Sequence, residues 1–354
     1  MTYIGGAATF NNKNVGTNKT VTATGLSLSG TDAANYSVNT TAVTTANITP
    51  AAIANVTGIS ANNKVYDATT TATLNTGTAG FTGKIGTDVL AVATATGAFT
   101  DPNAGNGKTV NISGITLTGA DAGNYTLTTN RATATANITA RGFTVSANDA
   151  TKIYGNSDPA LSFNVGGAAL AGGDTITSVI SGALARAPGE NVAASPYAIN
   201  QGTLAANTNY SITAFTPGQF TITPRALSIT ADNKLKVTDN ALPPLTATYN
   251  GFAFTDNPAS LAGTLAFATA ASALSPPGIY TLTPFGQSAT NYSISYVNGA
   301  LGIVNPLALP LPPGVLAAII SAYNENPGAI DPPTLIDKLI TITGAGVNLP
   351  PGVK

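Results

Sequence analysis

The sequence predicts an all-β protein built from small tandem modules, and three observations support this fold class. Only 8% of the 354 residues are charged, and Thr, Ala, Gly and Asn take up much of the remainder. Polar and apolar residues alternate with a period of two over several stretches, as in half-buried strands. The same motifs return after about 80–90 residues, a length that suits an independent module rather than one coil of a solenoid.

The first half of the chain contains one module type twice. Residues 16–36 (GTNKTVTATGLSLSGTDAANY) match residues 105–125 (GNGKTVNISGITLTGADAGNY) at a constant offset of 89. Both copies end in Ala-Asn-Ile-Thr, at 46–49 and 136–139. We define residues 1–50 as repeat 1 and 51–140 as repeat 2. Repeat 1 has no counterpart of the front half of repeat 2, so we expect an excised fragment with any export signal upstream.

The second half contains a related module twice. We define residues 141–224 as repeat 3 and 225–305 as repeat 4, the latter more divergent. Both have a lysine motif near the start and an Asn-Tyr pair followed by a β-rich tail near the end. These landmarks are Lys152, Tyr154, Gly155, Asn209 and Tyr210 in repeat 3, and Lys236, Asn291 and Tyr292 in repeat 4.

Within each repeat the pattern indicates strands. Polar and apolar residues alternate over Thr109–Leu117 and over Ala132–Thr139, and β-branched threonine suits the exposed face of a pleated sheet. Gly, Asn, Asp and Pro interrupt the pattern at the spacing of a small antiparallel, Ig-like β-sandwich. A β-grasp-like module is the alternative, because Ala169–Ser178 and Asp256–Leu261 are able to form short helices at equivalent places. The short links between repeats predict an elongated, monomeric rod.

After Pro306 the composition changes to a tail, residues 306–354. A Pro-rich spacer is followed by two expected short helices, Val315–Tyr323 and one starting at Asp331. No run reaches the roughly 18–20 apolar residues of a membrane helix, so we expect no membrane insertion.

Composition excludes several kinds of chemistry. The chain has no His, Cys or Trp, and its formal net charge is −1. Catalytic triads, disulfides and His- or Cys-ligated metals all need the absent residues. Nucleic-acid binding needs a basic face. We therefore expect no enzyme, no cofactor, no metal and no nucleic-acid partner.

At this point the motifs resemble known families. Lys64-Val65-Tyr66-Asp67, with Asn124-Tyr125, resembles the YDG repeat of filamentous-haemagglutinin-like exoproteins. Lys152-Ile153-Tyr154-Gly155, with Asn209-Tyr210, resembles the MBG repeat of YGX type, and Lys236-Val237-Thr238-Asp239 is a weaker match to it. The resemblance implies an extracellular, cell-surface adhesin of bacteria, exported by two-partner secretion, in which such modules form a stalk.

The predicted function is a non-catalytic spacer that holds a distal binding domain away from the cell. Two rival hypotheses stay open. The repeats themselves bind host or matrix glycans or glycoproteins, with differences such as the loop 166–187 carrying the site. Alternatively, flat threonine arrays at 71–73 and 133–135 bind ice or a mineral surface.

The residues that recur are interpreted as structural. Tyr36, Tyr125, Tyr210 and Tyr292 are expected to close the core at the start of a strand, with asparagine in the preceding turn. The lysines at the start of each motif, called the motif lysines below, are Lys64, Lys152 and Lys236, and we expect them to lie exposed on edge strands. A Lys–Asn isopeptide bond is the alternative for these lysines, but it needs a buried acid, and we find no acidic residue that recurs in all repeats.

The aspartates of the Gly-Thr-Asp and Gly-Ala-Asp sequences are interpreted as turn residues. Asp32, Asp121 and Asp101 are each expected to accept hydrogen bonds from their own backbone turn. One carboxylate in a loop is too few for a calcium site, which takes six to eight oxygen ligands.

Overall fold

The computed structural model describes residues 1–305, 314, 317, 320–321 and 324–325. These residues form two compact units. The first contains Met1–Val145, Val165–Ala183 and Thr203–Phe215, and the second contains Ser146–Asn164, Leu184–Gly202 and Thr216–Lys354. The division between the units falls inside repeat 3. The boundaries between repeats 1 and 2 and between repeats 2 and 3 therefore lie inside the first unit, and the boundary between repeats 3 and 4 lies inside the second.

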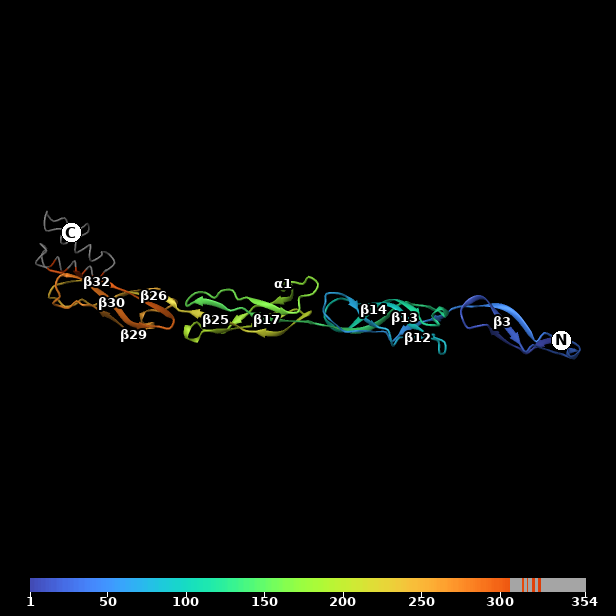
Figure 1. The fold of residues 1–354 in the computed structure, drawn as a ribbon. Helices are drawn as coiled ribbons and strands as arrows, with labels where there is room; N and C mark the ends of the chain where they lie inside the picture. Colours follow the sequence, from blue (N-terminus) through green and yellow to red (C-terminus); the bar gives the residue numbers. More distant parts are fainter. Residues whose placement is uncertain (306–313, 315–316, 318–319, 322–323, 326–354) are drawn as a thin grey trace, which may run out of the picture. The chain divides into compact units, whose positions relative to one another are not determined.

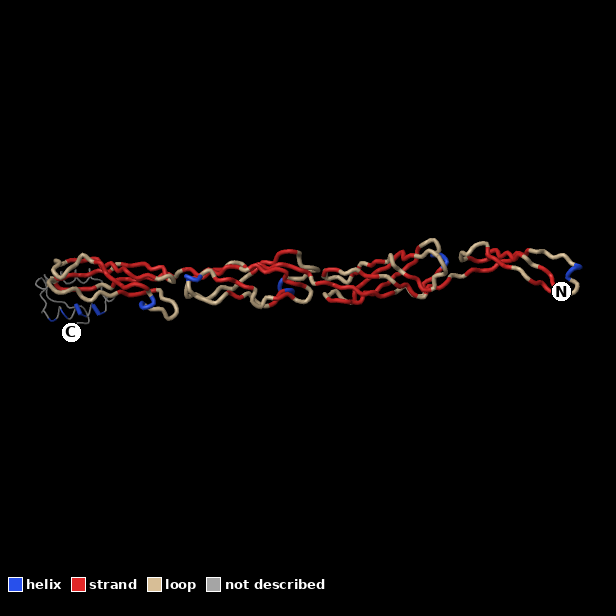
Figure 2. The backbone as a smooth tube through the Cα atoms, turned by 90° about the horizontal axis from the view of Figure 1, so that it is seen from below, coloured by secondary structure: helices blue, strands red, loops and turns tan. Residues whose placement is uncertain are grey.

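The predicted all-β class is confirmed. Strands make up 52% of the structure, and the one α-helix within residues 1–305 is the four-residue α1 (Ile176–Val179). The other helical segments are single 3-10 turns: η1 (Ala33–Asn35), η2 (Ala122–Asn124), η3 (Val192–Ala194) and η4 (Pro258–Ser260). Figure 2 shows these turns as short blue segments between red strands. Two of them, α1 and η4, occupy the places where the sequence allowed a short helix.

The first compact unit begins with repeats 1 and 2 (Figure 1). Repeat 1 contains β1 (Thr2–Ile4), β2 (Ala7–Phe10), β3 (Gly16–Thr24), β4 (Ser27–Ser29) and β5 (Thr41–Ile48). Repeat 2 contains β6 (Ala51–Ile53), β7 (Asn55–Thr57), β8 (Ser60–Ala61), β9 (Lys64–Val65), β10 (Thr71–Ala72), β11 (Leu74–Asn75), β12 (Gly80–Thr82), β13 (Ala91–Phe99), β14 (Gly105–Thr118), β15 (Tyr125–Leu127) and β16 (Ala132–Thr139). The main sheets have the orders β2-β3-β5 and β10-β13-β14-β16-β9.

Repeats 3 and 4 share one topology, a three-stranded and a four-stranded sheet. Repeat 3 contains β17 (Arg141–Ala147), β18 (Ala150–Ile153), β19 (Phe163–Gly167), β20 (Ile180–Ser181), β21 (Ala185–Arg186), β22 (Tyr197–Asn200), β23 (Ala205–Ala206), β24 (Tyr210–Thr216) and β25 (Gly218–Thr223). Repeat 4 contains β26 (Arg225–Ala231), β27 (Lys234–Val237), β28 (Ala247–Asn250), β29 (Ala262–Ala268), β30 (Gly278–Ser288), β31 (Tyr292–Val297) and β32 (Gly299–Val304). The sheet orders are β19-β17-β24 with β18-β25-β22-β21, and β28-β26-β31 with β27-β32-β30-β29.

The sheets are mixed, whereas the sequence predicted antiparallel ones. In repeat 4, β26 runs parallel to β31 and β27 parallel to β32. Repeat 2 pairs β6 with β15 and β9 with β16 in the same way. The reason is that in repeat 4 the chain passes from one sheet to the other between β26 and β27, and again in the same direction between β31 and β32. The alternation of polar and apolar residues does not show whether two strands pair in parallel or antiparallel.

Each compact unit has its own buried residues. In the first unit the fully buried side chains include Ile53, Ile112, Ile115, Ile138 and Phe143. In the second unit, one cluster joins Phe220 and Ile222 of repeat 3 to Leu227, Ile229 and Tyr292 of repeat 4. The apolar core therefore continues across the boundary between repeats 3 and 4.

The tail predictions fall mostly outside the described residues and remain predictions. Among the described residues, no helix is both long and apolar enough to cross a membrane.

Candidate functional site: the joints between repeats

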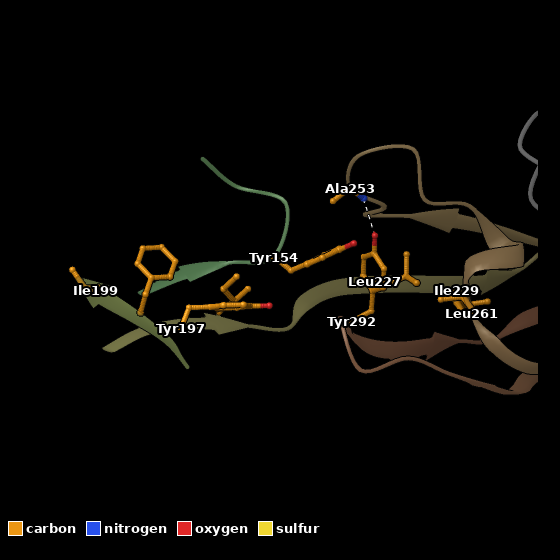
Figure 3. Packing of buried hydrophobic residues seen from close by; sticks show 10 residues of the cluster. Tyr154, Tyr197, Ile199, Leu227, Ile229, Ala253, Leu261 and Tyr292 are labelled. Atoms are coloured by element: carbon orange, nitrogen blue, oxygen red, sulfur yellow. Dashed lines mark hydrogen bonds between the residues drawn. The ribbon is translucent and has the colours of Figure 1, made fainter. Parts of the chain in front are cut away.

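A tyrosine–aspartate pair recurs in repeats 2, 3 and 4. The tyrosine is the second residue of each Asn-Tyr motif. Its hydroxyl donates to a carboxyl oxygen over 2.7 Å in Tyr125–Asp88, 2.8 Å in Tyr210–Asp174 and 2.6 Å in Tyr292–Asp256. The same hydroxyl accepts a backbone N–H from the residue three positions before the aspartate: Ile85 at 3.0 Å, Ala171 at 2.9 Å and Ala253 at 2.9 Å. Figure 3 shows the bond from Ala253 to Tyr292.

A second tyrosine reaches this aspartate from the preceding repeat. Tyr66 of repeat 2 donates to Oδ2 of Asp174 at 3.2 Å, the same oxygen that accepts from Tyr210. Tyr154 of repeat 3 donates to Oδ2 of Asp256 at 3.0 Å.

The two tyrosines at each of these boundaries also pack edge to face. The ring centroids are 5.3 Å apart for Tyr66 and Tyr210 and 5.4 Å apart for Tyr154 and Tyr292. Tyr154 points toward Tyr292 in Figure 3. Edge-to-face aromatic pairs add about 0.5–1.5 kcal/mol to the burial of the rings.

The asparagine of each Asn-Tyr motif binds a loop of the preceding repeat. Its side-chain oxygen accepts a backbone N–H, and its amide nitrogen donates to another asparagine. Asn124 binds Val15 N at 2.9 Å and Asn14 at 3.3 Å, Asn209 binds Ala104 N at 2.8 Å and Asn103 at 3.1 Å, and Asn291 binds Val192 N at 2.9 Å and Asn191 at 3.2 Å. The same pair of hydrogen bonds, called the asparagine clasp below, therefore occurs at each of the three boundaries.

An arginine begins repeats 3 and 4 and binds on both sides of the boundary. Arg141 donates from Nε to the carbonyl of Ala169 at 2.7 Å and from Nη1 to the carbonyl of Tyr66 at 3.4 Å. Arg225 makes the corresponding bonds to Gly251 at 2.9 Å and Tyr154 at 3.4 Å. The set of tyrosines, aspartate, asparagines and arginine at a boundary is called a joint below.

The joint between repeats 1 and 2 uses a lysine instead. Ala51 stands where repeats 3 and 4 have arginine, as the pairing of Ala51 with Tyr125 and of Arg225 with Tyr292 shows. Lys13 of repeat 1 forms ion pairs with Asp88 and Asp121, both at 2.6 Å. Because Lys13 is 61% exposed, solvent screens this attraction.

Burial and hydrogen bonding set the ionisation of the joint residues. Burial and the neighbouring Asp256 carboxyl raise the pKa of Tyr292 to about 12. Burial, together with Asp174 or Asp256, also raises the pKa of Tyr66 and Tyr154. Hydrogen bonds from Lys13 and Tyr125 hold the pKa of Asp88 below its usual range. These tyrosines are therefore neutral hydrogen-bond donors over the whole physiological range.

Gly155 allows the close approach of repeats 3 and 4. Its φ of +84° lies in the left-handed region, where side chains are strained. A Cβ at this position would lie 2.3 Å from the Cβ of Ala253. Both constraints require glycine directly after Tyr154.

The motif lysines were predicted to be exposed on edge strands, and this is wrong. Lys152 and Lys236 are 8% and 3% exposed, and the Lys64 side chain is 16% exposed. Each ammonium group is held by oxygens of its own repeat: Asp67 and Thr69 around Lys64, Asp158 and Glu190 around Lys152, and the carbonyls of Asn240 and Ala273 around Lys236. The strands are edge strands, but their lysines point inward, over Phe99 and Phe220 in repeats 2 and 3.

Arg186 completes the charged cluster around Lys152. It binds Asp158 and Glu190, and it lies over the rings of Tyr197 and Phe220 at 5.6 and 5.0 Å. Hydrogen bonds from Arg186 and Lys152 lower the pKa of Asp158, and those from Lys152 and Arg186 lower that of Glu190.

The turn aspartates give a divided result. Asp101 accepts the N–H of Asn103 at 2.9 Å, so its turn role is confirmed. Asp32 and Asp121 make no side-chain capping bond, so the prediction is wrong for both. Asp121 instead accepts the N–H of Val89, in the loop before β13, at 2.8 Å.

The tyrosines also differ from one repeat to another. Tyr125, Tyr210 and Tyr292 are 4–7% exposed at the start of a strand, in agreement with a core-closing role. Tyr36 is 61% exposed, so that expectation is wrong for repeat 1.

No acidic residue recurs in all four repeats, but one recurs in repeats 2, 3 and 4 and was missed from the sequence. Asp88, Asp174 and Asp256 precede their tyrosines by 37, 36 and 36 residues, and this nearly constant spacing is the signal that sequence reasoning missed. The recurring acid contacts tyrosine rather than a Lys–Asn pair. Within the described residues no group of three or more His, Cys, Asp or Glu is arranged to hold a metal.

Repeat 4 ends without the residues that a further joint needs. Thr238 stands where repeats 2 and 3 have Tyr66 and Tyr154. Tyr280 and Tyr197 pair with equivalent strands, and Leu274 precedes Tyr280 by six residues, as Asn191 precedes Tyr197. Leu274 is 80% exposed.

Comparison with known families agrees with the resemblance stated from the motifs. The YDG domain family matches residues 1–45 and 49–136, and the MBG domain (YGX type) family matches residues 143–221 and 227–302. The chain therefore contains YDG and MBG domains in tandem. No curated protein matches the sequence.

Solved structures add little. The crystal structure of Drosophila N-cadherin EC1-4 is similar over 81% of this chain and 83% of that chain, with 8% identity and a TM-score of 0.20. A TM-score this low does not establish a shared fold, and nothing is inferred from it.

Proposed function

We propose that this chain is a non-catalytic spacer segment of a secreted bacterial surface adhesin. Its tandem YDG and MBG domains are compatible with a surface-associated repeat protein. Extracellular localisation, export by two-partner secretion and the filamentous-haemagglutinin-like context are parts of this proposal. The expected form is a monomer that projects a binding domain from the cell and so supports adhesion.

The observation that carries the proposal is the recurrence of the joint. The asparagine clasp crosses all three boundaries, and at two of them a tyrosine of the preceding repeat also binds the aspartate of the next. A spacer has to resist bending where its modules meet, and polar pairs that need both repeats provide that resistance. The residues that recur serve contact between repeats, which supports a structural role for them.

A glycan array and a matrix-protein array test the proposal. The purified chain is applied to both, beside a variant in which Ser288 and Thr290 are replaced by alanine. A spacer gives no saturable binding to any spot. Specific binding by the chain would contradict a pure spacer.

The second candidate function, glycan binding, has one observation in its favour. An open groove of about 420 Å³ in repeat 4 is lined by polar side chains that include Asp256, Ser260, Ser288 and Thr290. Hydroxyl and carboxyl groups of this kind suit sugar hydroxyls. If binding occurs and the Ser288/Thr290 variant abolishes it, the groove is the site and the second candidate replaces the first.

Small-angle scattering of the whole chain tests the predicted rod. An elongated particle supports the spacer, whereas a compact globule contradicts it.

A further inference from the structure

The outer face of the four-stranded sheet differs between repeats 3 and 4. Strand β27 of repeat 4 corresponds to β18 of repeat 3, because each carries a motif lysine and pairs in parallel with the last strand of its repeat. In both strands the lysine points inward, so the residues on either side of it point to the outer face. The registers place Leu235, Val237, Gly302 and Val304 of repeat 4 at the positions of Thr151, Ile153, Thr221 and Thr223 of repeat 3.

These equivalent positions differ in exposure as well as in chemistry. The four residues of repeat 3 are all exposed, and three of them are threonine. In repeat 4, Leu235 and Val304 are 0% and 6% exposed, and Gly302 is also buried. Repeat 2 agrees with repeat 3, since Val65 and Thr139 are exposed. The outer face is therefore open to solvent in repeats 2 and 3, whereas in repeat 4 it is apolar and covered.

Asn324 binds the edge of this covered face. Among the residues that the structure describes, β27 is the last strand of its sheet. The Asn324 side chain accepts the N–H of Leu235 at 2.8 Å and donates to the carbonyl of Leu235 at 2.9 Å. A neighbouring antiparallel strand makes the same two bonds with the residue that it faces. The Asn324 carbonyl also accepts from the ammonium group of Lys234 at 2.9 Å. One asparagine thus takes the place of an added strand.

Ile320 lies on the same side of its segment as Asn324. Both residues are helical, and side chains four residues apart lie on one face of a helix. Both are also partly buried, whereas the helical residues Ala317, Ser321 and Glu325 are exposed. Because Asn324 binds Leu235, the side that carries Ile320 and Asn324 faces repeat 4.

The strand β27 has little protection of its own against pairing with another chain. Exposed lysine or proline usually provides this protection on edge strands. β27 contains no proline, and Lys236 is 3% exposed because its ammonium group binds carbonyl groups of its own repeat. Lys234 is 5% exposed and is held by Asn324. The contact with Asn324 is therefore what closes this edge.

We propose that the segment carrying Ile320 and Asn324, called the guard below, keeps repeat 4 from pairing with a second copy of this chain. Release of the guard frees the edge of β27 and uncovers the apolar face that contains Leu235 and Val304. Two copies then pair through β27 about a two-fold axis, because each offers the same edge and the same apolar face. The inference goes beyond the spacer proposal and does not rest on it.

The first experiment releases the guard in the whole chain with Ile320→Asp and Asn324→Asp. Sedimentation and hydrogen exchange are measured at increasing protein concentration, and the β30 amides report whether repeat 4 stays folded. At low concentration we expect the Leu235 amide to exchange at least about tenfold faster than in the unchanged chain. At high concentration we expect a dimer. The matched control, Ala317→Asp with Ser321→Asp, adds the same charges to the exposed side and should stay monomeric with slow exchange.

Two results would overturn the proposal. One is a Leu235 amide that exchanges as slowly in the released chain as in the control, and the other is a released chain that stays monomeric at every concentration. If the two aspartates unfold repeat 4, Asn324→Ala replaces them, with Glu325→Ala as its control, and the same two results decide.

A second experiment tests whether the uncovered face is the surface that pairs. Leu235→Thr and Val304→Thr are added to the released chain, which gives repeat 4 the threonines that repeat 3 has at 151 and 223. We expect this chain to remain monomeric at concentrations at which the released chain is a dimer. A dimer that persists would show association through another surface and would overturn the proposal.

Discussion

Tyr154 and Tyr292 belong to consecutive repeats and donate their hydroxyl hydrogens to the same oxygen, Oδ2 of Asp256, at 3.0 and 2.6 Å. Tyr66 and Tyr210 share Oδ2 of Asp174 in the same way. A repeat alone provides one tyrosine and the aspartate, and the second tyrosine comes from its neighbour. Each arrangement therefore couples the stability of one repeat to the presence of another.

Replacing Asp256 by asparagine turns the carboxylate that both tyrosines share into a neutral amide with a single oxygen. We expect Asp256→Asn to lower the free energy of unfolding of repeat 4 by about 2 kcal/mol, because hydrogen bonds to a charged group contribute about 1.5–3 kcal/mol. Urea unfolding followed by hydrogen exchange of the Ala253 amide measures this. Asp239→Asn is the matched control, since Asp239 lies exposed. Equal effects of the two substitutions would count against the shared oxygen.

Replacing Asn291 by alanine opens the asparagine clasp. The change leaves the N–H of Val192 and the side chain of Asn191 without this partner. We expect a loss of about 1–3 kcal/mol, the usual effect of an unpaired polar group, seen as faster exchange of the Val192 amide. Asn250→Ala, at an exposed position, should leave that amide unchanged. Slow exchange of Val192 in the Asn291 variant would show that the clasp is not needed.

Replacing Lys152 by methionine keeps the apolar stem and removes the ammonium group. Asp158 and Glu190 then lose a partner, although Arg186 still binds both. Breaking a buried ion pair costs about 3–5 kcal/mol, and the 38% and 42% exposure of the two acids reduces the expected loss to about 1–3 kcal/mol. Thermal unfolding measures it, with exposed Lys84→Met as the control. Equal melting temperatures would contradict a stabilising role for the cluster.

The joint tyrosines predict a loss of stability at alkaline pH. Their pKa is raised on folding, to about 12 for Tyr292, so the folded state holds these protons more tightly than the unfolded state. The resulting stability is fully present below the unfolded pKa of about 10. It is lost as the pH rises from about 10 through 12. Tyr292→Phe should flatten this decline in a series of urea unfolding curves, and an unchanged pH dependence would exclude Tyr292 as its source.

Local pattern predicted the strands, but it did not predict the joints. Alternation over Thr109–Leu117 identified part of β14, because a half-buried strand shows its faces in the sequence. Asp88, Asp174 and Asp256 lie in loops with different neighbouring residues. Only their nearly constant sequence distance from a tyrosine marks them as equivalent. Asn14, Asn103 and Asn191 share only a following small apolar residue. Contacts between repeats depend on the packing of distant segments, which periodicity does not contain.

The lysines were misplaced for a related reason. Lys152 lies on an edge strand, where exposed lysine is the common arrangement. Its inward direction depends on Phe220 and two acids from distant loops. The expectation for Tyr36 was wrong because residues 51–90, which bury Tyr125 in repeat 2, have no counterpart among residues 1–50.

The most direct test of coupling between repeats is a double-mutant cycle between Tyr154 and Asp256. Tyr154→Phe, Asp256→Asn and the double variant are compared with the unchanged chain through the opening free energy of the Val192 amide in native-state hydrogen exchange. If the joint links repeats 3 and 4, the two substitutions are non-additive by about 1 kcal/mol or more. Additive effects, or no change at Val192, would show that the repeats behave independently and would contradict the joint as the basis of a spacer.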